Sequence, residues 1–269
     1  MTPGATRPHL LSQRINAERL VVLGWPRAIL LQFAHPLVAA GVADHSSFRQ
    51  GRVSAVRRLH YTIRAMLALG FGNDTERHGA LEGIRTIHRR VNGTLREATG
   101  IFPGGTRYSA EDPVLVLWVH ATLLQTIPMV YELLVAPMSD AERDTYCVET
   151  AQVAVDLGAP PEAVPMTWDA LHAYLDRMYA SGAIAVGTDA RALAPHVLSP
   201  LGLVAAPYEW LNRLLTVGLL PPRIRDAYGY RWTERDGRAL RRMAGLLRGA
   251  RRLTPPLLAL WPEARRVSS

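Results

Sequence analysis

A long apolar segment with one histidine at its centre restricts how this chain can fold. The segment extends from Tyr108 to Leu124, and nearly all of its residues from 113 onward are apolar. Asp112 is a suitable helix N-cap, and Pro113 suits the first helical turn, where no backbone N–H is needed. A helix this apolar is predicted to lie inside the protein. Helical spacing places these residues on one of its faces: Val116, Leu117, His120, Leu123, Leu124 and Ile127.

The imidazole of His120 needs a polar partner on that apolar face. A buried neutral imidazole is stabilised by a carbonyl, a carboxylate, a water molecule or a metal ion. The residues alone leave two interpretations open. His120 is either a core histidine with a hydrogen-bond partner in the protein, as is usual for buried polar groups, or the ligand of a metal or of haem iron.

Two residue counts exclude several kinds of chemistry. Cys147 is the only cysteine, which excludes intramolecular disulfides, cysteine-ligated zinc sites, iron–sulfur clusters and covalent haem attachment through Cys-x-x-Cys-His. All 31 basic residues are arginine, so a pyridoxal phosphate Schiff base, a Walker-type phosphate loop and a lysine nucleophile are excluded as well. One cysteine is compatible with a reducing compartment, and we expect a cytoplasmic protein.

Apolar residues recur with helical spacing along the chain, and this pattern predicts an all-α fold in a single domain. Glycine and proline clusters separate the helices, and residues 139–142 have the pattern of a capping box. No alternating apolar run of strand length is visible, and we interpret the glycine-rich segment 102–108 as a plain connector. The predicted helices are 13–22, 26–43, 53–69, 76–98, 113–135, 140–157, 167–181, 188–196, 203–218, 222–228 and 234–250.

The net charge of +8 is concentrated near the C-terminus. Between Arg223 and Arg266 there are twelve arginines and four acidic residues. Such a segment is either a solvated helix face or a peripheral contact with an anionic membrane surface. No aromatic residues alternate with these arginines, so we expect no nucleic acid partner. Residues 1–13 lack the apolar core of a secretory signal, and the apolar segment 28–42 is too short to span a bilayer.

Several polar residues are candidates for chemistry. Arg85 and His88 are three residues apart on one predicted helix, and His35 and His45 flank a segment of small residues. Arginine can hold a carboxylate through two hydrogen bonds, and histidine can act as acid, base or donor. A solvent-facing stripe is the alternative for Arg85 and His88. The chain has no Glu-x-x-His pair, no His-Glu-x-x-His and no Gly-x-Ser-x-Gly motif. For a histidine on an apolar helix, noncovalent haem binding therefore remains a candidate.

Six segments resemble, in the right order, motifs of one oxygenase family. Its members include the fungal ER-bound oxygenase of mycophenolic acid synthesis and the bacterial latex-clearing rubber oxygenase. The similarity extends from about Arg14 to Trp232, and each motif alone is weaker than the combination. The segments are 25–46, 85–93, 108–123, 142–149, 220–225 and 228–232.

The resemblance implies an all-helical haem b protein with a core likened to the globin fold, in which one histidine holds the iron. The histidine of the matching Trp-Val-His-Ala-Thr segment corresponds to His120, and the stretch lining the distal side corresponds to Arg85 and His88. Rubber oxygenase carries a lysine where this chain has His88. The acidic base proposed for rubber cleavage has no counterpart in residues 66–72, so we do not expect rubber cleavage.

Together these features predict a haem b-dependent oxidoreductase, an oxygenase that uses O₂ or a peroxide on a hydrophobic small molecule. His120 is the predicted iron ligand, and Arg27, His35 and His45 either contact the haem propionates or stabilise the fold. The alternative is a helical protein that binds haem or lipid without chemistry.

A thiolate ligand from Cys147 is a third possibility, although no local motif supports it. For the whole chain we predict a flexible N-terminus at 1–13, an oxygenase-like domain at 14–232 and an arginine-rich helical extension at 233–269.

Overall fold

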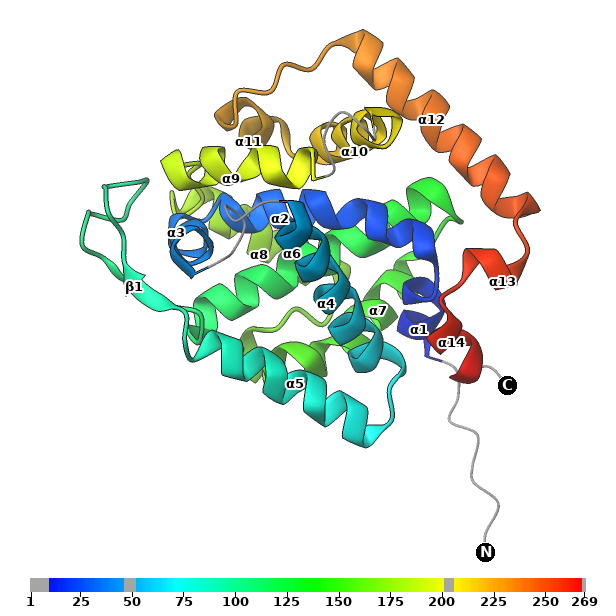
Figure 1. The fold of residues 1–269 in the computed structure, drawn as a ribbon, viewed down its shortest axis with the longest axis horizontal. Helices are drawn as coiled ribbons and strands as arrows, with labels where there is room; N and C mark the ends of the chain where they lie inside the picture. Colours follow the sequence, from blue (N-terminus) through cyan, green and yellow to red (C-terminus); the bar gives the residue numbers. More distant parts are fainter. Residues whose placement is uncertain (1–9, 46–51, 201–205, 268–269) are drawn as a thin grey trace, which may run out of the picture.

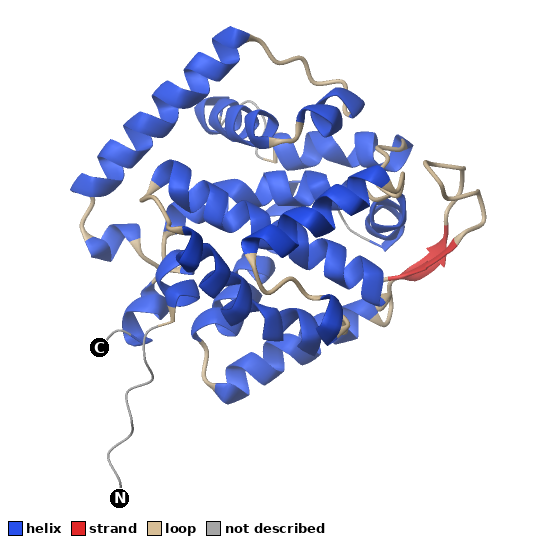
Figure 2. Ribbon diagram, turned by 180° about the vertical axis from the view of Figure 1, so that it is seen from behind, coloured by secondary structure: helices blue, strands red, loops and turns tan. Residues whose placement is uncertain are grey.

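The computed structural model describes residues 10–45, 52–200 and 206–267, and α-helices dominate this part of the chain (Figure 1). The all-α prediction is confirmed. The helices form a bundle, and one small antiparallel hairpin projects from its edge (Figure 2). The elements are α1 Leu11–Asn16, the 3₁₀-helix η1 Arg19–Gly24, α2 Trp25–Phe33, α3 Pro36–His45, α4 Arg52–Phe71, α5 Asp74–His88, β1 Asn92–Thr94, β2 Arg107–Ser109, α6 Pro113–Leu134, α7 Asp140–Asp156, the 3₁₀-helix η3 Pro161–Ala163, α8 Trp168–Ala180, α9 Thr188–Leu198, α10 Ala206–Leu219, α11 Pro222–Ala227, α12 Glu234–Leu253, α13 Pro256–Ala259 and α14 Pro262–Val267.

Helix α6 is the central helix of the bundle. It begins as predicted, because the Asp112 side chain accepts a hydrogen bond from the Val114 amide at 2.9 Å and Pro113 occupies the first turn. Helices α1, α2, α7, α8 and α12 and the 3₁₀-helix η1 all contact it. By length and composition α6 could cross a membrane, but most of it is buried among these neighbours, as expected for a core helix.

The largest buried side chains come from the helices around α6. Trp118 of α6, Phe33 of α2, Tyr146 of α7 and Leu171 of α8 are almost inaccessible to solvent and belong to one continuous core. Burying an aliphatic or aromatic side chain of this size contributes about 1.5–3 kcal/mol, so this core fixes α6 relative to the neighbouring helices.

The predicted helix over residues 26–43 is in fact two helices that meet at a sharp corner. Helix α2 ends at Phe33, α3 begins at Pro36, and the axes of the two parts differ by 107°. Proline disfavours the α conformation in the residue before it and lacks the N–H that a continuous helix needs. The side chain of His35 therefore lies at a corner of the fold and not along one helix face.

The predicted helix over residues 76–98 was too long. Helix α5 ends at His88, and β1 pairs with β2 in an antiparallel hairpin in which Gly93 faces Tyr108. A Cβ atom at position 93 would lie 2.5 Å from the Tyr108 hydroxyl, so this close pairing requires glycine. The glycine-rich segment 102–108 belongs to this hairpin and is not a plain connector. Strands of three residues are too short to show an alternating pattern, so no strand was predicted here.

The C-terminal helices follow the outside of the bundle. Helix α12 packs against α6 and α10, and α13 and α14 bring the chain back to α1 and α4 (Figure 1). Arg251 of α12 holds the nearly buried carboxylate of Glu18 through two hydrogen bonds of 2.6 and 2.5 Å. At the other end of the chain, α1 starts at Leu11, so the predicted flexible segment 1–13 ends in a helix, and its first nine residues lie outside the described part.

Candidate active site

A large cavity of about 1510 Å³ lies beside α6. Its volume exceeds the roughly 300–1,000 Å³ that is typical of ligand sites in proteins. Side chains from α2, α3, α4, α5, α6 and α7 line it, and most of this lining is apolar. The part of α6 that faces it consists of Leu115, Val116, Val119, His120, Leu123, Leu124 and Ile127. All but two of these residues, Leu115 and Val119, belong to the face predicted from the sequence.

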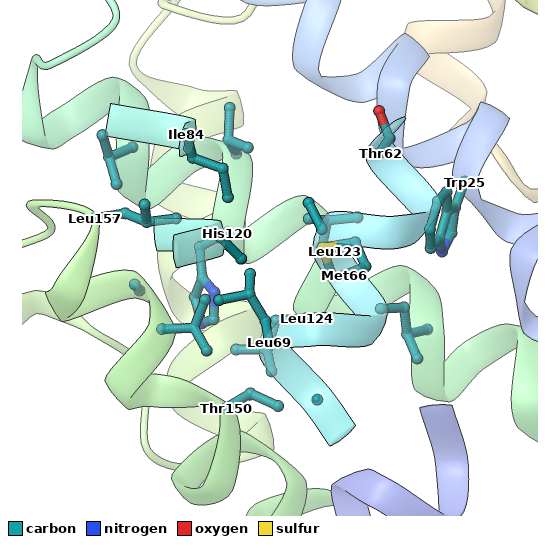
Figure 3. Close-up of a pocket in the computed structure, with 18 of the residues that line it drawn as sticks. Trp25, Thr62, Met66, Leu69, Ile84, His120, Leu123, Leu124, Thr150 and Leu157 are labelled. Atoms are coloured by element: carbon teal, nitrogen blue, oxygen red, sulfur yellow. The ribbon is translucent and has the colours of Figure 1, made fainter. Parts of the chain in front are cut away.

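His120 is a polar side chain on the face of α6 that lines the cavity, and no hydrogen bond explains its position. Its Nε2 atom is buried and has no hydrogen-bond partner in the described structure. Figure 3 shows the ring among aliphatic side chains that include Leu69 of α4, Ile84 of α5 and Leu157 just after α7. A buried polar atom left unpaired costs about 1–3 kcal/mol, and such atoms are rare in folded proteins.

Burial lowers the pKa of His120 to about 4, so the ring is neutral at neutral pH. A neutral imidazole keeps one nitrogen with a free lone pair, which is the form that binds a metal. Haem iron brings its own equatorial ligands and needs only one protein nitrogen in an apolar cavity. The donor, its protonation state and the apolar walls therefore fit a haem iron, and no protein group of the described structure takes the place of that partner at Nε2.

His88 also lines the cavity, from the last turn of α5. Burial lowers its pKa, and the nearby Glu111 carboxylate partly opposes this effect. The ring is half-buried. His88 can therefore present a neutral imidazole, with one donor and one acceptor, to a molecule in the cavity.

Arg85 does not share the cavity with His88. Its guanidinium donates to the carbonyl of Asp156, with a distance of 3.0 Å from Nε, and to the Glu82 carboxylate at 2.7 Å. These bonds tie α5 to the end of α7, where a cation also interacts favourably with the helix dipole. Arg85 and His88 were predicted to lie together in a binding site. In the structure only His88 lines the cavity.

The cavity face of α5 contains a different arginine. Arg77, Ala80, Ile84 and His88 are spaced by three, four and four residues, which is helical spacing, and all of them line the cavity. Arg77 lies 3.4 Å from the Asp156 carboxylate and is the cation of this face. Arg77 was not among the residues predicted from the sequence, although counting back from His88 with helical spacing reaches it.

His45 lines the cavity at the end of α3, where it also has a structural contact. Its Nε2 atom lies 2.8 Å from the carbonyl oxygen of Asn92, to which it donates. The ring meets Tyr108 edge to face, and the Tyr108 hydroxyl donates to Asp44 at 2.7 Å. These contacts join the hairpin to α3, so His45 helps to close one end of the cavity.

Arg27 lies outside the cavity, although contact with a haem propionate was one of its two predicted roles. It is fully buried, and its guanidinium donates to the carbonyl of Leu219 at 2.7 Å, to Gln125 at 2.8 Å and to the hydroxyl of Thr126. Burial lowers its pKa to about 10. With its donors directed at these three acceptors, Arg27 joins α2 to α6 and α10 and stabilises the fold.

His35 also lies outside the cavity lining. It is buried at the corner between α2 and α3, its ring lies 5.2 Å from that of Phe102, and its Nδ1 atom has no partner in the described structure. Burial lowers its pKa to about 4, partly opposed by Asp112.

We predict that this buried histidine makes the protein sensitive to acid. Because the pKa of His35 is lower in the folded state than its usual 6.5, the unfolded chain takes up the proton more readily. Stability that is present above pH 6.5 is then lost as the pH falls towards 4, by about 3 kcal/mol. Urea unfolding at pH 7 and pH 4 measures this loss. His35→Gln should reduce it, and an equal loss in both proteins would contradict the prediction.

Two carboxylates of the cavity wall already have structural partners. Glu149 accepts hydrogen bonds from the amides of Leu11 and Ser12 at 3.2 and 2.6 Å and so caps α1, while Glu18 is paired with Arg251. The imidazoles of His88 and His120 are therefore better placed than these two carboxylates for chemistry in the cavity.

Cys147 is buried in the core of α7 and does not line the cavity. Burial raises the pKa of its thiol to about 12, so the thiolate form needed for ligation is disfavoured. The geometry gives no support to a cysteine ligand.

The sequence matches one protein family over most of its length. A sequence model described as the catalytic domain of the ER-bound oxygenase mpaB/B′ and rubber oxygenase matches residues 13–249. The chain belongs to this family. The resemblance noted from six motifs is thereby confirmed, and the domain is of an oxygenase type.

Two curated relatives are similar to this chain over most of its length. They are the uncharacterized protein Mb2261 of Mycobacterium bovis and the uncharacterized protein Rv2237 of Mycobacterium tuberculosis. Each is 26% identical over 233 residues, which cover 84% of this chain and 87% of the relative. A search of the solved structures finds no significant match.

Proposed function

We propose that the protein is a haem b-dependent oxygenase that acts on a hydrophobic small molecule with O₂ or a peroxide. The observation that carries this proposal is the unpaired, neutral imidazole of His120 in the wall of a large apolar cavity. Family membership supports the oxygenase class, and the haem is our inference from this side chain.

The residues that line the cavity would have different roles. His120 would hold the iron through its unpaired nitrogen, and a bound haem would supply the redox chemistry with O₂ or a peroxide. The aliphatic side chains around the ring exclude water and provide contacts for an apolar substrate.

Two further side chains can act on polar groups in the cavity. His88 presents a neutral imidazole that can donate a hydrogen bond to a polar oxygen. Arg77 can bind a carboxylate, such as a haem propionate or an acidic substrate group. We assign to Arg77 the anchoring role that the sequence had suggested for Arg85 and Arg27.

The experiment that tests the proposal is a titration of the purified protein with haemin, followed by absorption spectroscopy. We expect a shifted Soret band that saturates at one haem per chain, followed by haem-dependent O₂ consumption when apolar substrates are added. A heat-unfolded sample is the control for unspecific haem binding.

The alternative function, a carrier that binds an apolar ligand without chemistry, is favoured by the same apolar lining. It predicts that a fluorescent fatty acid binds in the cavity while haemin produces no saturable spectral change. That result would overturn the haem proposal.

A further inference from the structure

The C-terminal helices expose an unusual combination of leucines and arginines to solvent. On α12 the exposed residues Arg235, Arg238, Arg242, Leu246 and Leu253 follow helical spacing along one stripe. The stripe is basic in its first half and apolar in its second. Two more exposed leucines, Leu257 and Leu258, follow on α13. We call these seven residues the C-terminal surface.

The leucines of this surface are far more exposed than a helix at the edge of a bundle requires. Leu253 is 86% exposed, and Leu246, Leu257 and Leu258 are 61–66% exposed. All four fall within one short segment, whereas single exposed apolar residues elsewhere are scattered. An apolar cluster next to charged residues is typical of a binding surface.

The opposite face of α12 accounts for its packing on the bundle. Ala244 is buried, and Leu247 packs against the same cluster as Val130 and Leu134 of α6. Arg248 donates to the carbonyls of Glu132 and Leu133 at the end of α6, and Arg251 binds Glu18. The helix is therefore held in place by its inner residues, and the exposed leucines are not among the residues of that cluster.

Charge decides which partner fits this surface. The region from Arg223 to Arg266 has twelve arginines and four acidic residues. A second copy of the chain in a symmetric dimer would bring this basic region against itself, and like charges in contact are unfavourable. An anionic lipid surface offers phosphates to the arginines and an apolar interior to the leucines.

The chain leads from this surface to a wall of the cavity within a few residues. Three residues after Leu258, Trp261 lines the cavity, where its amide donates to the Ala17 carbonyl at 3.0 Å and the Arg19 guanidinium lies over its ring. A short piece of chain therefore joins the C-terminal surface to the cavity wall.

We propose that the C-terminal surface docks the protein on an anionic lipid membrane, with Leu253, Leu257 and Leu258 inserted at the interface and the exposed arginines at the lipid phosphates. The proposal does not rest on haem, because it depends only on the outer face of α12 and α13. The sequence indicated only a basic segment, and the structure identifies which of its side chains are exposed.

Co-sedimentation of the full chain with vesicles tests the proposal. The vesicles consist of phosphatidylcholine alone or of phosphatidylcholine with phosphatidylglycerol. We expect binding to the anionic vesicles, weakened by salt. Leu253→Glu combined with Leu257→Glu should weaken it by at least roughly tenfold, because carboxylates would face the anionic lipid. Arg238→Gln combined with Arg242→Gln should weaken binding at low salt.

The matched control is Ile101→Glu, an exposed apolar residue near the tip of the hairpin that is 58% exposed. This variant should bind anionic vesicles like the wild type. Circular dichroism checks that every variant folds, as expected for changes at exposed positions. The proposal is overturned if the wild type does not bind anionic vesicles, or if the leucine variant binds equally well. It is also overturned if the wild type is a dimer in solution that the leucine variant converts to a monomer, because the surface then binds a second copy.

Discussion

Haem binding is expected to disappear when His120 is replaced by alanine. The Soret band of the haemin-loaded protein should be lost, and the haem affinity should fall by at least about 100-fold, because even partners of a metal ligand contribute 10–100-fold. The physical reason is that the side chains next to His120, among them Leu69, Ile84 and Leu157, are aliphatic and cannot bind iron in its place. Equilibrium haemin titration of both proteins measures the change.

Two controls separate ligation from damage to the fold. The Nε2 atom of His120 has no partner in the described structure, so His120→Ala breaks no hydrogen bond of that atom and should leave the helical circular dichroism of the apoprotein unchanged. In His120→Gly, free imidazole should restore a Soret band because it can occupy the vacated space. His88→Ala should keep the band, since His88 is not the assigned ligand. An unchanged haem spectrum in His120→Ala would show that iron is held elsewhere.

The sequence predicted the wall of the site on α6 because a single helix follows one periodic rule. Once Asp112 and Pro113 fix the start of the helix, the position of His120 on the cavity face follows from the spacing of its neighbours. On α5 helical spacing was used to pair His88 with Arg85, which is not the arginine of the cavity face. Ile84 and His88 are four residues apart and both line the cavity, whereas Arg85 lies beside this row. Its guanidinium donates to the Asp156 carbonyl, outside the cavity.

Other parts of the site depend on contacts between distant segments, and local patterns do not contain them. Trp261 reaches the cavity only because Arg251 and the backbone around Leu260 attach the C-terminal helices near Glu18. The hairpin that follows α5 is likewise stabilised across its strands, by the close contact of Gly93 with Tyr108. Helical periodicity carries no information on either contact.

Replacing Arg27 by alanine is expected to destabilise the fold strongly while leaving the cavity chemistry intact. The change would leave the Leu219 carbonyl and the Gln125 side chain without their donor, and it would remove one of the largest fully buried side chains. Each of these acceptors left without a donor costs about 1–3 kcal/mol, and the space left by the side chain adds to the loss. Urea unfolding at neutral pH measures this loss.

The chain offers two informative comparisons for Arg27. Arg27→Lys keeps a charge but cannot direct donors at Leu219, Gln125 and Thr126 together, so it should recover only part of the stability. Arg85→Ala should cost far less, because that side chain is 41% exposed. The folded fraction of Arg27→Ala should bind haemin as tightly as the wild type. If Arg27→Ala were instead as stable as the wild type and bound haemin more weakly, Arg27 would be a cofactor contact. Its assignment to the stability of the fold would then be wrong.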